Sequence, residues 1–67
     1  MYRIKIYALP DVQPEDYERF APALERTKRE LQSKAYPAHA TITDLQSGKT
    51  VVRLYLNNDG SIHETTT

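Results

Sequence analysis

The chain of 67 residues contains no cysteine and only two glycines, Gly48 and Gly60. Without cysteine it has no disulfide, no thiolate nucleophile and no cysteine-ligated metal site, although small secreted domains usually depend on disulfides. We therefore expect a reducing, cytoplasmic setting. Because glycine is confined to two turn positions, no glycine-rich loop is present to hold a phosphate.

An excess charge and long apolar runs are also missing. Nine basic and nine acidic side chains cancel, whereas a general nucleic-acid-binding domain is usually distinctly basic. Residues 1–6 interleave charged and apolar side chains, so we expect neither a signal peptide nor a membrane span. We expect residues 1–67 to form a single domain that buries only about 60% of the surface exposed by the unfolded chain. A dimer or a partner would add to its marginal stability.

The two glycines close short turn signals, Gln46-Ser47-Gly48 and Asn58-Asp59-Gly60, between runs that alternate apolar and polar residues. A three-residue hairpin loop needs positive φ at its third residue, which glycine adopts without a Cβ clash. The turns predict strands at about 38–45, 49–57 and 61–65. Counting outward from the loops gives these cross-strand pairs: Leu45 with Lys49, Ile42 with Val52, Ala40 with Leu54, Asn57 with Ser61, and Leu56 with Ile62.

The first half of the chain predicts a strand and a helix. Residues 2–9 alternate with the period of a half-buried strand, which we expect to stop at Pro10. Pro14, followed by acidic residues that the helix dipole favours, predicts a helix start. Pro22 predicts a kink in that helix, because it removes a backbone donor and clashes with the carbonyl of Glu18. An apolar stripe at helical spacing then extends to about residue 35: Tyr17, Phe20, Leu24, Thr27, Leu31 and Ala35.

Together these elements predict an α+β fold with two layers in the order β-α-β-β-β. One kinked amphipathic helix packs on one face of a mainly antiparallel sheet. The first strand is expected beside the second strand or at the far side of the meander, and crossover rules favour a parallel pairing if the two are adjacent. We expect the threonine tail, residues 65–67, to be frayed. The strands contribute these residues to the core: Ile4, Ile6, Ala38, Ala40, Ile42, Val52, Leu54, Leu56 and Ile62.

The same register exposes an aromatic and basic set of side chains on the opposite face of the sheet: His39, Thr41, Thr43, Val51, Arg53, Tyr55 and His63, with Arg3, Lys5 and Tyr7 from the first strand. Tyrosine and arginine are enriched at the hot spots of protein interfaces. Single-stranded nucleic-acid binders use the same residue types to stack bases and pair with phosphates. An ordinary solvated sheet face is the third interpretation.

The sequence predicts no catalytic or metal centre and no cofactor. His39 and His63 lie on different predicted strands, without the third ligand that a zinc site needs. The carboxylates of Asp44, Asp59 and Glu64 are scattered, and no nucleophile, base and orienting group occur together. We therefore predict that the chain is not an enzyme.

The order of elements resembles the DNA-damage-inducible protein I family, whose members are small modulators of the RecA recombinase. The likeness covers about two thirds of the chain and rests on the following segments: the strand Arg3-Ile4-Lys5-Ile6, a helix with Leu24 and Glu30-Leu31, the break Ala35-Tyr36-Pro37, and the strand with Thr50-Val51-Val52. Members of that family continue into a second, acidic helix, whereas residues 57–67 here predict a hairpin and a tail. The resemblance implies a small non-enzymatic regulator and carries over no site residues.

We therefore predict a small regulatory or interaction protein, a class that includes many phage and plasmid regulators. It binds a protein partner, or a second copy of itself, through the exposed sheet face or an edge strand. The alternative is a single-stranded nucleic-acid-binding module that uses the same face. The sequence specifies neither the partner nor the oligomeric state. The predicted contact residues are Arg3, Lys5, Tyr7, Arg53, Tyr55 and His63.

Overall fold

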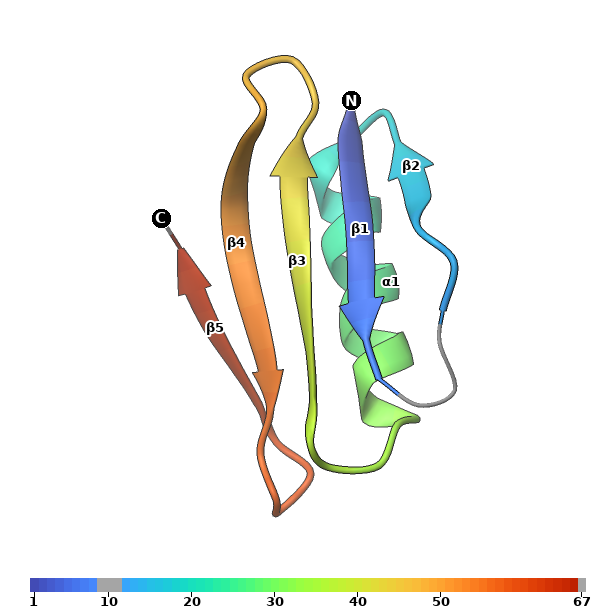
Figure 1. Cartoon of the computed structure of the whole chain (residues 1–67), viewed down its shortest axis with the longest axis vertical. Coiled ribbons are helices and arrows are strands. Elements are labelled where there is room, and N and C mark those ends of the chain that lie inside the picture. The colour runs from blue at the N-terminus through green and yellow to red at the C-terminus, as the bar shows by residue number, and fades with distance from the viewer. Residues whose placement is uncertain (9–11, 67) are drawn as a thin grey trace.

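The computed structural model of the chain describes residues 1–8 and 12–66. Its elements are β1 (Tyr2–Tyr7), β2 (Glu15–Tyr17), α1 (Phe20–Gln32), β3 (Ala38–Asp44), β4 (Lys49–Leu56) and β5 (Ile62–Thr66). The strands form one sheet in the order β2-β1-β3-β4-β5, and every neighbouring pair is antiparallel. The helix packs on one face of this sheet (Figure 1), which confirms the α+β fold in two layers. The predicted stop at Pro10 lies outside the described residues.

β2 corrects the prediction of a helix start at Pro14. Residues Glu15–Tyr17 pair antiparallel with β1, and Asp16 lies opposite Arg3. The Arg3 guanidinium donates two hydrogen bonds to the Asp16 carboxylate, at 2.7 and 3.0 Å. This pairing comes from a part of the chain distant in sequence, and such tertiary contacts override local helix signals. The helix therefore begins at Phe20 and ends at Gln32, and the predicted end near Ala35 is also wrong.

Pro22 does not produce the predicted kink. It is the third residue of α1, which runs without interruption from Phe20 to Gln32. The first four N–H groups of a helix have no intrahelical acceptor, so a proline in the first turn removes no hydrogen bond. Glu18, whose carbonyl would have clashed with the proline ring, precedes the helix.

β1 lies between β2 and β3 and is antiparallel to both. The expectation that adjacent first and second predicted strands would be parallel is therefore wrong. Because β2 reverses the chain before the helix, the crossover through α1 joins β2 to β3. Those two strands run in the same direction, with β1 inserted between them (Figure 1). The two strands that the helix connects, β2 and β3, are therefore the parallel ones, as the crossover rule expects.

The two glycine turns determine most of the register as predicted. Gly48 and Gly60 have φ angles of +74° and +90°. The amide of Asn57 donates to the carbonyl of Ser61 at 2.8 Å, which confirms the three-residue second loop. These other predicted pairs are also confirmed: Ile42 with Val52, Ala40 with Leu54, and Leu56 with Ile62.

The first hairpin differs from the prediction near its loop. Lys49 pairs with Asp44 instead of Leu45, and the register shifts between Ile42 and Thr43. Val51 is the extra residue of this β-bulge, which places two residues of one strand opposite one residue of the other. Its side chain is half-buried and packs against the core, so the prediction that it is exposed on the other face is wrong.

Two of the C-terminal threonines belong to the last strand of the sheet. Thr65 pairs with Arg53 and Thr66 with Val52 as the last residues of β5. β4 is long enough to pair with both residues, and the frayed tail stays a prediction. Thr67 lies outside the described residues.

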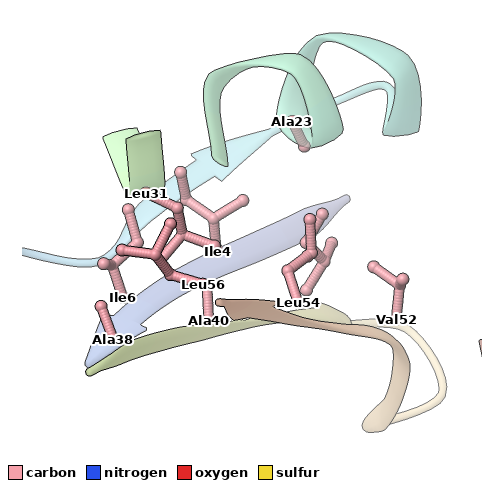
Figure 2. Close-up of a cluster of buried hydrophobic side chains, with 10 residues drawn as sticks. Ile4, Ile6, Ala23, Leu31, Ala38, Ala40, Val52, Leu54 and Leu56 are labelled. Carbon is pink, nitrogen blue, oxygen red and sulfur yellow. The ribbon is translucent and has the colours of Figure 1, made fainter. Parts of the chain in front are cut away.

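The core lies between the sheet and α1. Side chains from β1, β3 and β4 point toward the helix, which contributes Ala23 and Leu31 (Figure 2). Thr27 is fully buried among them, and its hydroxyl donates to the Ala23 carbonyl at 2.8 Å. Ile62, the first residue of β5, is only half-buried. The sheet residues of the core are Ile4, Ile6, Ala38, Ala40, Ile42, Val52, Leu54 and Leu56.

Candidate functional site

The candidate site is the face of the sheet opposite α1, which we call the helix-free face. Side chains alternate between the two faces along a strand, so residues between core positions point away from the helix. In Figure 1 this face is turned toward the viewer, with α1 behind β1 and β3. The six predicted contact residues all lie on it. Its residues are Arg3, Lys5, Tyr7, Asp16, His39, Thr41, Thr43, Thr50, Arg53, Tyr55, His63 and Thr65.

Four aromatic side chains lie directly opposite one another on β1, β3, β4 and β5, and we call them the aromatic row: Tyr7, His39, Tyr55 and His63. The ring centroids of Tyr7 and His39 are 4.5 Å apart, and their planes differ by 10°. The next two centroid distances are 6.2 Å and 6.5 Å, with interplanar angles of 24° and 34°. These distances lie within the range of interacting ring pairs. The row therefore links four strands through their side chains.

The rings of Tyr7, His39 and Tyr55 are stacked along the row, and the ring of His63 is tilted against that of Tyr55. Side chains stand roughly perpendicular to a sheet, and the row crosses the strands, so the stacked rings present their edges to solvent. Those edges carry the hydroxyl groups of the tyrosines and the ring nitrogens of the histidines. Tyr7 and Tyr55 are 40% and 41% exposed, so both side chains are accessible to a partner.

A row of polar side chains lies beside the aromatic row. Thr41 separates Lys5 from Arg53 in this row. The Lys5 ammonium lies 5.2 Å from the centroid of the Tyr7 ring, within the range of a cation–π contact. Within residues 1–8 and 12–66, neither Lys5 nor Arg53 has a carboxylate partner.

Asp16 is the single carboxylate on the described part of the helix-free face, and Arg3 neutralises it. The two hydrogen bonds from the guanidinium, helped by its positive charge, hold the pKa of Asp16 below its usual value. The same hydrogen bonds and the carboxylate charge raise the pKa of Arg3. The pair joins β1 to the short edge strand β2.

The other carboxylates of the sheet edges lie on the helix side. Glu15 is opposite Ile4, and Glu64 is opposite Leu54. Both reach cations of α1: Glu15 lies 3.6 Å from Arg26, and Glu64 lies 2.6 Å from Lys28. The described helix-free face therefore has three cations and one carboxylate, a net charge of +2 with neutral histidines, in a protein of zero net charge. The charges balance in composition and are segregated in space.

Sequence reasoning found the residues of this face and missed part of its arrangement. Counting residues outward from the first hairpin loop already places His39 opposite Tyr55, as the structure has them. The alignment of Tyr7 with these two rings required the position of β1, which the sequence left open. Asp16 was missed because its segment was assigned to the helix.

The described residues contain no group of three or more histidine, cysteine, aspartate and glutamate side chains that could hold a metal ion. Within the same residues, no helix is long and apolar enough to cross a membrane. The absence of enzymatic activity stays a prediction.

Comparisons with models of known protein families, with curated proteins and with solved structures found no match to this chain. The resemblance to the DNA-damage-inducible protein I family stays a prediction. At the place where that family has its second helix, this chain continues from β4 into β5.

Proposed function

We propose that the chain is a small non-enzymatic interaction protein that regulates a protein partner by binding it through the helix-free face. The observation that carries this proposal is the aromatic row, in which four rings are aligned across four strands. Ordered aromatic side chains lose little further freedom on binding, so more of the contact energy is available for affinity. Tyrosine is also among the residues most enriched at hot spots. The lack of cysteine supports a cytoplasmic setting.

The orientation of the rings favours a protein over a single-stranded nucleic acid. Bases bind to aromatic platforms by stacking on an open ring face. His39 lies between the rings of Tyr7 and Tyr55, and Tyr55 lies between those of His39 and His63, so neighbouring rings restrict the access of a base to their faces. One face of Tyr7 is turned toward His39, and Lys5 also lies over this ring. The edges that remain accessible suit the hydrogen-bonding and apolar contacts of a protein interface.

The charge of the helix-free face favours a different protein over a second copy of the chain. Two copies that met through this face would bring two sets of uncompensated cations together. Like charges placed across an interface suppress that association. We therefore propose that the partner is a different protein and that the chain does not self-associate through this face.

The proposal is tested by affinity capture from a lysate of the native host. Three forms of the chain are immobilised: the unchanged protein, Tyr55→Ala and Tyr36→Ala. Tyr36 is the matched control, because it is 60% exposed and lies outside the aromatic row. Circular dichroism and amide spectra establish that each form is folded. We expect one specific protein to be retained by the unchanged protein and by Tyr36→Ala, and lost from Tyr55→Ala. Equal retention by the two variants would contradict the proposal.

Nucleic-acid binding is tested separately with a single-stranded oligonucleotide at low salt. We expect no binding that maps to the aromatic row. Binding that depends on Tyr55 and weakens steeply with added salt would replace the proposed function with a nucleic-acid-binding one.

A further inference from the structure

We infer that the partner presents an acidic segment, rich in glutamate or aspartate, to the helix-free face. This inference rests on the proposed function and specifies the chemistry of its partner. It follows from the charges on the face, from the hydrogen-bonding groups that the face offers, and from the spacing of its two unpaired cations.

The charges on the face are only partly compensated within the chain. Arg3 is matched by Asp16 at 2.7 Å. Lys5 and Arg53 are exposed and have no carboxylate partner in residues 1–8 and 12–66. On the helix side, Arg26 and Lys28 pair with carboxylates, whereas the exposed cations Arg29 and Lys49, outside the helix-free face, have no carboxylate partner in the described residues. The chain therefore leaves two cations of this face for an external anion.

The two unpaired cations of the face only donate hydrogen bonds, whereas its hydroxyl groups and neutral histidine rings can both donate and accept. Lysine and arginine only donate, and tyrosine hydroxyls and the N–H groups of histidine rings can donate at the exposed edges of the aromatic row. A carboxylate accepts such hydrogen bonds and gains from the positive charge at the same time. A segment that offered only donors would leave the Lys5 and Arg53 groups unmatched.

The spacing of Lys5 and Arg53 suits an extended acidic segment. They lie in one row with β3 between them, which places their backbones about 10 Å apart at the usual distance between strands. Three residues of an extended chain span about the same distance. In a flat β-strand, side chains three residues apart would face opposite sides. In the polyproline II conformation, which has three residues per turn and rises about 3.1 Å per residue, they face the same side. An acidic segment in that conformation that crosses the strands can therefore place carboxylates three residues apart over both cations, with the intervening residues beside the aromatic row.

The test is a titration of the ¹⁵N-labelled protein with a capped peptide of ten glutamates. The parallel probes are a peptide of ten glutamines and a single-stranded oligonucleotide of ten thymidines. We expect the glutamate peptide to shift the amides of Lys5, Tyr7, His39, Arg53 and Tyr55, and the glutamine peptide to leave them unchanged. The glutamate peptide should also bind more tightly than the oligonucleotide.

A charge-matched pair of variants establishes the role of the two cations. In Lys5→Gln/Arg53→Gln, we expect the dissociation constant for the glutamate peptide to rise by about fivefold, since each exposed ion pair contributes about two- to threefold. The control, Arg29→Gln/Lys49→Gln, removes the same charge from exposed positions outside the helix-free face. Its dissociation constant should change by less than about twofold, because charges distant from the contact are screened.

Three results would overturn the inference: no shift of the face by the glutamate peptide, equal effects of the two double variants, or tighter binding of the oligonucleotide. These results are distinguishable from failure of the proposed function. If a captured protein is lost on Tyr55→Ala while the glutamate peptide does not bind, the interaction function stands and the acidic partner is wrong. If Tyr55→Ala retains the captured protein, the proposed function itself is wrong.

Discussion

His39 stacks on Tyr7 across the β1–β3 pair, with ring centroids 4.5 Å apart and planes within 10° of parallel. The two residues are direct register partners. Their contact ties the N-terminal strand to the C-terminal hairpins on the face of the sheet that the helix does not cover. This face is thus organised by its own side-chain contacts, in addition to the core beneath it.

The stacking contact should be measurable as a coupling in the free energy of unfolding. A double-mutant cycle of Tyr7→Ala and His39→Ala should give a favourable coupling of about 0.5–1 kcal/mol, as aromatic cross-strand pairs do. Chemical denaturation of the four proteins gives this value. The same cycle on Lys5 and Thr41, the neighbouring register pair, should give a smaller coupling. Equal couplings would show that the rings do not interact beyond ordinary strand pairing.

Substitution of Gly60 should destabilise the fold because of the backbone conformation of this residue and not because of crowding. Its φ angle is +90°, and a Cβ at this position meets no atom within 4 Å. Gly60→Ala should therefore lower the free energy of unfolding by about 1–2 kcal/mol, the cost of left-handed geometry for an L-residue. Gly60→Asn should cost less, because asparagine visits this region more readily. Thermal denaturation of the two variants distinguishes them, and an equal or greater loss for asparagine would contradict the assigned turn.

Leu54 should be among the residues most sensitive to truncation. It is completely buried on β4 between the sheet and α1 (Figure 2). Leu54→Ala should lower the free energy of unfolding by about 2–5 kcal/mol through lost burial and the cavity that remains. Leu45→Ala provides the control, because Leu45 is 37% exposed in the first turn. Its cost should be under about 1 kcal/mol, and similar losses at both positions would argue against this core.

The Arg3–Asp16 pair should be visible in the titration of the Asp16 carboxyl. Its folded pKa is lowered by the hydrogen bonds from Arg3, so its stabilising contribution is present above the unfolded pKa. The contribution is lost as the pH falls through the folded pKa. Carboxyl ¹³C spectra should show Asp16 titrating below an ordinary aspartate. Arg3→Gln should move the titration upward, whereas Lys5→Gln should move it much less. An unchanged midpoint in Arg3→Gln would exclude the pair in solution.

The hairpins were predictable from sequence because their determinants are local. A glycine at positive φ and the alternation of apolar residues specify which residues face each other, as the pair Leu56 and Ile62 shows. The predicted core followed from the same count. The bulge at Val51 was not predictable in this way, since the four-residue loop and the extra residue compensate each other and leave the inner register unchanged.

β2 was missed because its determinants are not local. Glu15 and Asp16 after a proline are typical of a first helical turn, and only their pairing with Ile4 and Arg3 makes them a strand. That same strand determines the direction of the crossover and hence the place of β1. The sequence could therefore indicate an aromatic and basic face, but not that four of its rings form one continuous row.

The central claim is that the helix-free face binds a protein partner through the aromatic row. It is tested most directly by the dissociation constant of the captured partner, measured by calorimetry with the unchanged chain, Tyr55→Ala and Tyr36→Ala. We expect Tyr55→Ala to raise the constant by about 30-fold or more, as the loss of a hot-spot tyrosine does, and Tyr36→Ala to change it by less than about twofold. A Tyr55→Ala protein that is folded and binds the partner as tightly as the unchanged chain would contradict the claim.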